Sequence, residues 1–344
     1  MIAATLKAVL KSIAFASGAL PLWHRQANAD RLTVVMFHRV LRREDPRWRL
    51  ADPGYTVSDV TFRACLDFFR RHYSVVDSAA VLAAAQGGPP LPPRPLLITL
   101  DDGWADNASA ALPILREAGL PSLMFAVSEG IGRPHPFWWE VLTSARLIGR
   151  LGAADMAALW QGAGGGGPPP PPDARGIQAL VDRLYRVDEA ARAALIEPYR
   201  QAVAAAGEQR QTVTAEELKA MPAGGMAIGS HGASHTPLDS LPDPEADLAL
   251  SRRTLGDWLG EPPATFSFPN GRYDAKALSA ARDVGFKLIF TSDACLSPLT
   301  AGRPGSDLLG RIYIEEKLIT DAAGRFRPEL LALWLFRREA RRLH

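Results

Sequence analysis

Two adjacent carboxylates, Asp101 and Asp102, stand directly after a short and mostly apolar run, residues 96–100. A run of this length between Pro95 and Gly103 predicts a strand buried on both faces, as in a parallel sheet. Adjacent carboxylates repel each other, so two ionised side chains at the end of such a strand favour a bound cation or a shared proton. The simpler alternative is an acidic turn that caps the next helix.

His231 and His235 are four residues apart, a spacing that places both rings on one side of a helical turn, within reach of one ion. A solvent-exposed pair is the simpler alternative. With one carboxylate of the Asp101–Asp102 pair, the histidines would form a site of two histidines and one carboxylate. Three protein ligands leave positions open for water and substrate, as in catalytic zinc sites. We expect a divalent metal, Zn²⁺ before Fe²⁺, Mn²⁺ or Co²⁺, because the same ligand types also bind those ions.

The remaining carboxylate would act as a general base on a water molecule that the cation has acidified. The hydroxide formed in this way can attack a carbonyl, and release of an amine then needs a general acid. His38, which follows the apolar run 33–37, is the candidate for this acid, and a structural histidine at a strand end is the alternative. The other histidines fit no such position: His24, His72, His135 and His344.

Short strands and amphipathic helices alternate along much of the chain, which predicts βαβ units with right-handed crossovers. The expected strands are residues 33–37, 73–76, 96–100, 123–127, 226–229, 265–268, 287–291 and 311–314. Seven or eight such strands favour a distorted, closed α/β barrel of the TIM type over an open sheet. The carboxyl ends of barrel strands lie on one face, so His38, the two aspartates, the two histidines and the Pro269–Asn270 turn should meet there.

We expect three parts in the chain: an N-terminal amphipathic helix or targeting segment (1–30), the barrel (31–320) and a basic C-terminal helix (321–344). The regular alternation breaks at residues 141–212, where alanine-rich helical segments surround a Gly/Pro-rich linker, 162–173. Consecutive prolines beside consecutive glycines form an extended spacer next to a flexible one. We therefore expect an insertion that is partly mobile and has no catalytic group of its own.

The composition of the 344 residues is that of an ordinary globular protein, with 47% hydrophobic and 22% charged residues. A formal net charge of +2 argues against nucleic acid as a partner. The two cysteines, Cys65 and Cys295, form no metal motif and no disulfide framework.

Lys7 and Lys11 lie within an apolar N-terminal pattern, which favours an amphipathic helix on a membrane or on the protein itself over a cleaved signal peptide. No stretch reaches the ~20 apolar residues of a membrane span. We expect a cytoplasmic or membrane-peripheral location rather than a periplasmic or secreted one, with the oligomeric state left open.

Taken together, these motifs resemble the polysaccharide deacetylase family, the carbohydrate esterases that share the nodulation-protein-B homology domain. Residues 99–103 are similar to the family motif Thr-Phe-Asp-Asp-Gly, with Leu100 in place of phenylalanine. Residues 231–235 are similar to its motif His-Ser/Thr-x-x-His, with Gly232 in place of serine or threonine. The resemblance extends from about residue 31 to about 295, without the insertion. It implies a general base, Asp101, and three metal ligands: Asp102, His231 and His235.

Two further segments carry the resemblance. Residues 266–271 are similar to the groove-forming Arg-x-Pro motif, but Ser267 stands where many members have the arginine that orients the base. Residues 36–40 resemble the Tyr-His-x-Ile/Val segment of exopolysaccharide-associated members, in which an N-terminal histidine replaces the C-terminal acid. This implies that His38 is the acid, in keeping with the lack of a C-terminal Leu-x-His motif.

The substrate-binding candidates are Pro269 and Asn270, from the groove-forming motif, and Trp104, whose flat ring could stack on a sugar. Trp138 and Trp139 have the same capacity, and a role in packing between barrel and insertion is their alternative.

We therefore expect a metal-dependent hydrolase that removes N-acetyl groups from amino sugars of a chitooligosaccharide or exopolysaccharide. A close alternative is a carbohydrate esterase acting on O-acetyl groups. A more distant one is a catalytically weak, glycan-binding homologue, suggested by Leu100 and by the arginine missing at position 267.

Overall fold

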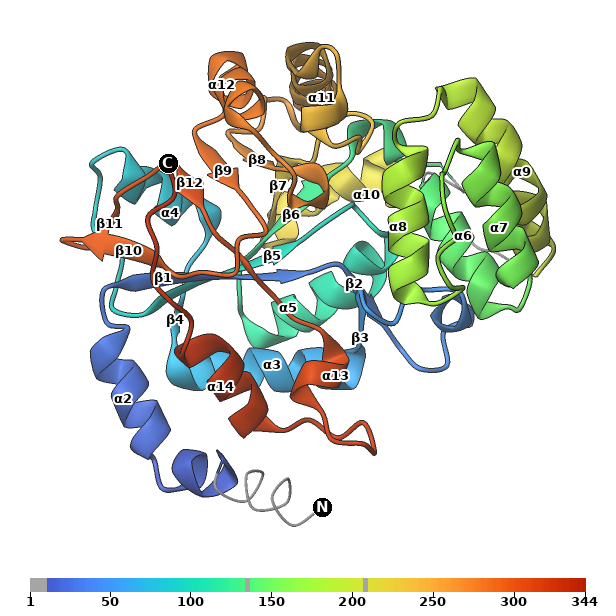
Figure 1. Cartoon of the computed structure of the whole chain (residues 1–344). Helices are drawn as coiled ribbons and strands as arrows, with labels where there is room; N and C mark the ends of the chain where they lie inside the picture. The colour runs from blue at the N-terminus through green and yellow to red at the C-terminus, as the bar shows by residue number, and fades with distance from the viewer. Residues whose placement is uncertain (1–10, 134–136, 207–209) are drawn as a thin grey trace.

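A curled parallel sheet forms the centre of the computed structural model, which describes residues 11–133, 137–206 and 210–344 (Figure 1). His135 lies outside the described residues. Neighbouring parallel strands follow the order β1 (Arg31–Phe37), β5 (Pro95–Leu100), β6 (Ser122–Ala126), β7 (Met226–Ser230), β8 (Thr265–Ser267) and β9 (Leu288–Phe290). These are short runs of buried residues, as expected for strands covered on both faces.

Residues 308–313 pair with both edge strands of this parallel sheet. β12 (Leu308–Leu309) pairs with β9, whereas β13 (Ile312–Tyr313) pairs with β1 at the other edge. Only Gly310 and Arg311 separate these two short strands. The sheet therefore curls into a barrel, which confirms the expected fold class.

Several short strands extend this arrangement. β4 (Ser74–Val75) is parallel to β5, β10 (Ser297–Thr300) is antiparallel to β1, and β11 (Arg303–Pro304) is antiparallel to β10. A separate parallel pair is formed by β2 (Arg39–Leu41) and β3 (Thr56–Ser58).

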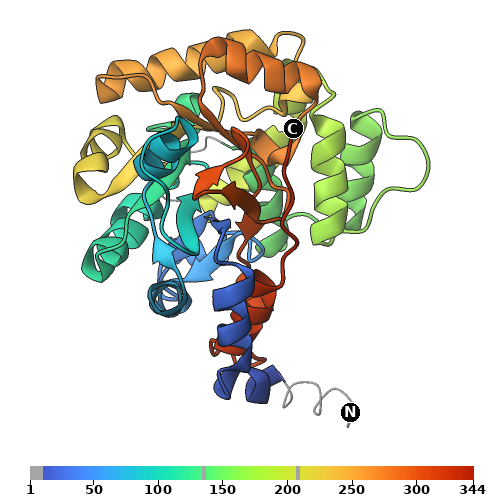
Figure 2. The same ribbon diagram turned by 90° about the vertical axis from the view of Figure 1, so that its left-hand side faces the viewer.

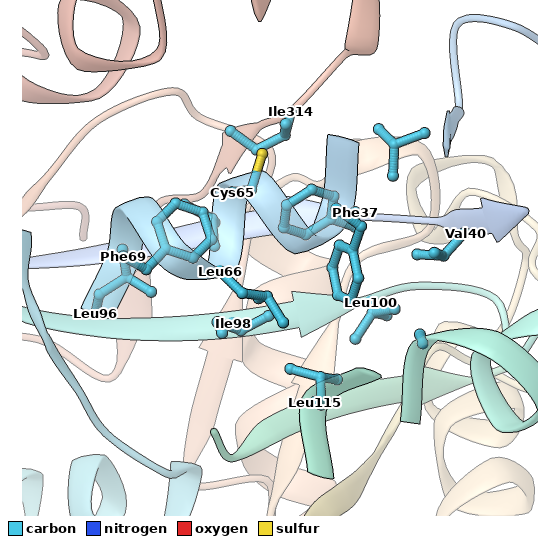
Figure 3. Close-up of a cluster of buried hydrophobic side chains, with 14 of the residues drawn as sticks. Phe37, Val40, Cys65, Leu66, Phe69, Leu96, Ile98, Leu100, Leu115 and Ile314 are labelled. Carbon is cyan, nitrogen blue, oxygen red and sulfur yellow. The ribbon is translucent and has the colours of Figure 1, made fainter. Parts of the chain in front are cut away.

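Helices cover the outside of the sheet: α3 (Asp59–His72), α4 (Ser78–Ala85), α5 (Leu112–Ala118), α10 (Ala215–Ala220), α11 (Pro244–Leu259), α12 (Ala275–Val284), α13 (Glu316–Ile319) and α14 (Pro328–Phe336). α3 shows how they pack. Ser58 caps its first turn by accepting a hydrogen bond from Thr61 N at 3.2 Å. Cys65, Phe69 and their apolar neighbours on the same face lie against the side chains of β1 and β5 (Figure 3).

The insertion folds as a group of four helices with a hydrophobic core of its own. These helices are α6 (Trp138–Leu147), α7 (Ala153–Gly162), α8 (Ala174–Leu184) and α9 (Glu189–Ala205). Leu142, Met156 and Leu180 are fully buried between them. The group lies beyond the carboxyl ends of β1 and β5 (Figure 1), which places it beside the predicted site.

α2 (Ala19–Ala27) and α14, near the start and the end of the described chain, pack together. The His24 ring stacks on Phe336 with ring centroids 3.8 Å apart. A basic helix was predicted for residues 321–344. The helix observed in this range is α14, which is apolar and largely buried. The arginines at 337, 338, 341 and 342 follow α14 in the non-helical end of the chain, so hydrophobic burial rather than the basic residues determines where this helix lies. Among the described helices, none combines the length and hydropathy that crossing a bilayer requires.

Candidate active site

Asp102, His231 and His235 converge at the carboxyl ends of β5 and β7. Their potential ligand atoms all lie within 4.8 Å of one another. Asp102 Oδ1 is 3.5 Å from His231 Nε2 and 3.3 Å from His235 Nε2. All three side chains are buried.

The donor atoms of this trio suit a metal ion. Asp102 Oδ1 is buried and accepts no hydrogen bond from any described residue, whereas Oδ2 accepts one from Trp104 Nε1 at 2.9 Å. His231 Nδ1 lies 2.8 Å from the Ser267 carbonyl, so it carries the proton and leaves the lone pair of Nε2 facing Asp102. A buried acceptor without a donor, beside imidazole nitrogens, is the environment that a divalent cation fits.

The electrostatics keep Asp102 and His231 in the protonation states of metal ligands. Burial lowers the pKa of His231 to about 4, so the imidazole is neutral near neutral pH. Burial alone would raise the pKa of Asp102, but the interaction with His235, whose Nε2 lies 3.3 Å from Oδ1, outweighs it and holds that pKa well below its usual value. The result is an ionised carboxylate beside a neutral imidazole.

The two histidines lie on a loop and not on the helical turn that their spacing suggested. Asp247 of α11 holds this loop by accepting hydrogen bonds from Ala233 N at 2.9 Å and Ser234 N at 3.1 Å. Gly232 has a φ of 79°, and a Cβ atom there would lie 2.9 Å from Asp247 Oδ1. Glycine in place of the family's serine or threonine therefore has a steric reason.

The backbone is strained at several positions of the site. Among the described residues, five that are not glycine have a positive φ, and three of these are Asp102, His235 and Asn270. Such conformations cost about 1–3 kcal/mol each and persist where the surrounding structure enforces them. Here the strain turns two of the three potential ligands toward one point.

Asp101 is held by Arg311, a residue that the sequence analysis did not select. Arg311 donates to both carboxylate oxygens, from Nη1 to Oδ1 at 2.6 Å and from Nη2 to Oδ2 at 2.8 Å. Burial alone would raise the pKa of Asp101, but the positive charge of Arg311 lowers it below its ordinary value. Nη2 also donates to Ser267 Oγ at 2.7 Å. An arginine from the end of the barrel thus contacts the position where the family motif has its own arginine, and the unusual Ser267 was the available signal.

His38 lies at the junction of β1 and β2, half-buried between two tyrosines. Its ring centroid is 4.7 Å from that of Tyr55 and 5.8 Å from that of Tyr313. Nδ1 is buried with no hydrogen-bond partner among the described residues. The ring lines the same cavity as Asp101 and Asp102.

The predicted substrate-binding residues have different surroundings. Trp104 is buried behind Asp102, with the Arg39 guanidinium 4.3 Å from its ring centroid, so it supports the ligand instead of presenting a free face. Asn270 lines the cavity and donates a hydrogen bond to the Tyr185 hydroxyl at 3.2 Å. Pro269 is buried beside Gly232.

A cavity of about 490 Å³ lies between the barrel and the insertion. Its barrel side carries His38, the two aspartates and the two histidines. The insertion supplies Trp139, Glu140, Thr143, Arg146, Ile177 and Val181. The Trp139 ring stacks on His235 with centroids 4.3 Å apart, the packing role that was one of its two alternatives. The insertion therefore forms a wall of the cavity.

Glu140 is a second functional candidate that sequence reasoning missed. Its Oε1 accepts a hydrogen bond of 3.4 Å from Asp52 N and lies 3.7 Å from Arg39 Nη1. Arg39 is already engaged by Asp106, to which Nε and Nη2 donate at 3.1 and 3.0 Å. Burial raises the pKa of Glu140 to about 7. A partly buried carboxyl so weakly paired at a cavity wall is typical of functional sites.

Comparisons with known proteins agree with this geometry. The polysaccharide deacetylase family model matches residues 181–289, which include both histidines. Over 234 residues, 67% of this chain, the sequence is 20% identical to YxkH of Bacillus subtilis (strain 168), which is named a polysaccharide deacetylase. The chain spans only about half of that relative, 55% of its length.

Solved structures show the same fold. The deacetylase PplD of Streptococcus pyogenes, in complex with acetate, is similar over 89% of this chain and 98% of its own, with a TM-score of 0.55 and 16% identity. IcaB from Ammonifex degensii matches 89% of this chain and 97% of its own, with a TM-score of 0.54 and 20% identity. Residues 181–289 are thus similar in sequence to the polysaccharide deacetylase family, and the fold is that of these solved deacetylases.

Proposed function

We propose that this protein is a metal-dependent deacetylase that hydrolyses N-acetyl groups of amino sugars in a poly- or oligosaccharide. One observation carries the proposal: an arginine-paired carboxylate, Asp101, lies beside the Asp102–His231–His235 trio in one cavity. Asp101 Oδ2 is 3.8 Å from His231 Nε2. A base and a metal site at that separation can act on one water molecule.

The residues divide the work of amide hydrolysis. Asp102, His231 and His235 would hold a divalent ion, which when bound polarises the acetyl carbonyl and acidifies water. Asp101 removes the proton of the attacking water, and Arg311 keeps that carboxylate ionised and oriented. His38 donates a proton to the departing nitrogen from the tyrosine-lined side of the cavity.

The insertion supports substrate binding in this proposal. Glu140 accepts hydrogen bonds from sugar hydroxyls, because its Oε1 is only weakly engaged by protein groups. Arg146, whose buried Nε has no partner among the described residues, is a donor on the same wall. Few and well-placed polar groups on an apolar wall are typical of small-molecule sites.

The two alternatives from the sequence make different predictions. A glycan-binding homologue without turnover has no need for a buried Arg311–Asp101 pair, because burying two charges costs desolvation free energy and the benefit of this pair is catalytic orientation. An O-acetyl esterase would need His38 less, because an alkoxide leaves with less help than an amine.

Product analysis tests the proposal. The purified protein, supplied with Zn²⁺, is incubated with N-acetylchitooligosaccharide and separately with acetylated xylan, and released acetate and new free amines are counted. We expect amines from the first substrate and a loss of roughly 10²–10⁴-fold in Asp101→Asn. Acetate from xylan alone would assign the esterase, and no product from either would favour the binding protein.

A further inference from the structure

The N-terminal segment packs on the protein through only one of its faces. Phe15 stacks near Phe68 of α3, with ring centroids 6.1 Å apart. His24 is fully buried against Phe336, and the Asn28 side-chain amide donates to the Phe336 carbonyl at 2.8 Å. The sequence left open whether this helix lies on a membrane or on the protein, and one face does lie on the protein.

Large apolar side chains of this segment are also exposed to solvent. Ile13, Leu22 and Trp23 are 57%, 56% and 46% exposed. They are three of the five large hydrophobic side chains that stand exposed in the described part of the chain. Leu22 and Trp23 share the outer face of α2 with the small Ala19, at the spacing of one helical turn. A helix that rests on a protein and faces water normally has a polar outer face.

The charged side chains of this segment itself are all cationic, although Glu329 accepts a hydrogen bond from Ser12 and Asp67 lies beside Arg70. Residues 1–29 contain three cations and no aspartate or glutamate. Lys11 and Arg25 are exposed on the described part of the segment. Arg70 and Arg71 are exposed at the end of α3, next to His72, whose ring lies 5.7 Å from Phe15. Apolar side chains bordered by cations are the pattern of a helix that lies in the interface of an anionic bilayer.

We propose that the segment Lys11–Ala27 docks this protein on the surface of an anionic lipid bilayer, with Ile13, Leu22 and Trp23 among the lipid headgroups. α2 lies at the amino end of β1, and the insertion lies beyond the carboxyl ends of the strands (Figures 1 and 2). The residues that line the cavity come from those carboxyl ends and from the insertion. Docking therefore leaves the cavity uncovered. The proposal does not depend on the reaction that the site performs.

Vesicle flotation with the full chain tests this surface. We expect binding to phosphatidylglycerol vesicles, weaker binding at high salt, and little binding to phosphatidylcholine alone. The double variant Leu22→Glu/Trp23→Glu should lose at least about tenfold in vesicle affinity, because both apolar contacts are removed. Lys11→Glu/Arg25→Glu should lose the preference for the anionic lipid.

Val60→Glu is the matched control, since Val60 is 70% exposed on α3 and lies away from this face. It should bind vesicles like the unaltered protein, and all variants should keep their thermal midpoint. No binding to anionic vesicles, or equal binding by the Leu22/Trp23 variant, would overturn the proposal. A dimer in light scattering that this variant converts to a monomer, without vesicle binding, would make the face an interface between two copies instead.

Discussion

At the residue scale, the pair of Arg311 and Asp101 determines when the base is ionised. Arg311 holds the pKa of Asp101 low, so the carboxylate is ionised at and well below neutral pH. In Arg311→Gln, no positive charge opposes the effect of burial, so the pKa of Asp101 rises. A smaller fraction of Asp101 is then ionised at a given acidic pH. We expect the acidic limb of the pH–rate profile to move upward by roughly 1–3 pH units.

Measurement of kcat/KM against pH tests this expectation, with Arg311→Lys as the control that keeps a positive charge and should shift the limb less. Removing one partner of a buried pair also costs about 3–5 kcal/mol of stability, so the thermal midpoint must be followed. Reduced activity with an unchanged acidic limb would show that Arg311 only supports the fold.

His38 is tested by the demands of the leaving group. His38→Ala should keep its metal and lose roughly 10²–10⁴-fold in N-deacetylation, because the amine departs unprotonated without an acid. Hydrolysis of an aryl acetate should fall much less, since that leaving group needs no proton. Asp101→Asn is the control that should impair both substrates. Equal losses of His38→Ala on the two substrates would leave His38 a structural role only.

At the element scale, α6 connects the insertion with the reaction site. Its first turn places Trp139 on His235 and Glu140 on the cavity wall. Glu140→Gln should raise KM for an N-acetylated oligosaccharide by about tenfold or more, the usual effect of weakening hydrogen bonds to a charged group. Aryl acetate hydrolysis should stay within about twofold, because that substrate has no sugar hydroxyls.

Steady-state kinetics on both substrates measure this difference, with the exposed Glu197→Gln of α9 as the matched control. A parallel loss on both substrates would contradict a substrate-binding role. It would show instead that Glu140 acts through Arg39, which lies over the Trp104 ring that supports Asp102.

The parallel strands and many of the helices could be predicted from local patterns in the sequence. Apolar runs of strand length and amphipathic helices predicted the parallel strands and the barrel, because burial on both faces leaves a clear signal in the sequence. The strand-end rule then placed His38, Asp101, Asp102 and the histidine loop on one face. The helical turn expected at 231–235 was wrong, since Asp247 and Gly232 stabilise a loop there.

The parts of the site that the sequence did not predict depend on long-range packing. Arg311 meets Asp101 only because β12 and β13 span the two edges of the curled sheet. Glu140 reaches the cavity only because the insertion forms a hydrophobic core of its own beside the strand ends. From the sequence, the insertion was expected only as helical segments around a Gly/Pro-rich linker. Neither contact has a fixed sequence spacing, so no motif could have indicated it.

At the scale of the whole molecule, the candidate site combines three contributions. The barrel supplies the base and the three potential metal ligands, its last segment supplies Arg311, and the insertion supplies the opposite wall. The N-terminal helix lies at the far end of the strands (Figure 1), so the proposed lipid docking and the proposed glycan binding would use different sides of the molecule.

The central claim is that Asp102, His231 and His235 hold the metal on which deacetylation depends, while Asp101 does the proton transfer. Its most direct test measures bound metal and N-deacetylation together in four preparations: unaltered protein, Asp102→Ala, His235→Ala and Asp101→Asn. We predict about one metal per chain and full activity in the first, and neither metal nor activity in the two ligand variants. We predict that Asp101→Asn keeps its metal while turnover falls roughly 10²–10⁴-fold. Full metal content in His235→Ala, or loss of metal in Asp101→Asn, would contradict this assignment.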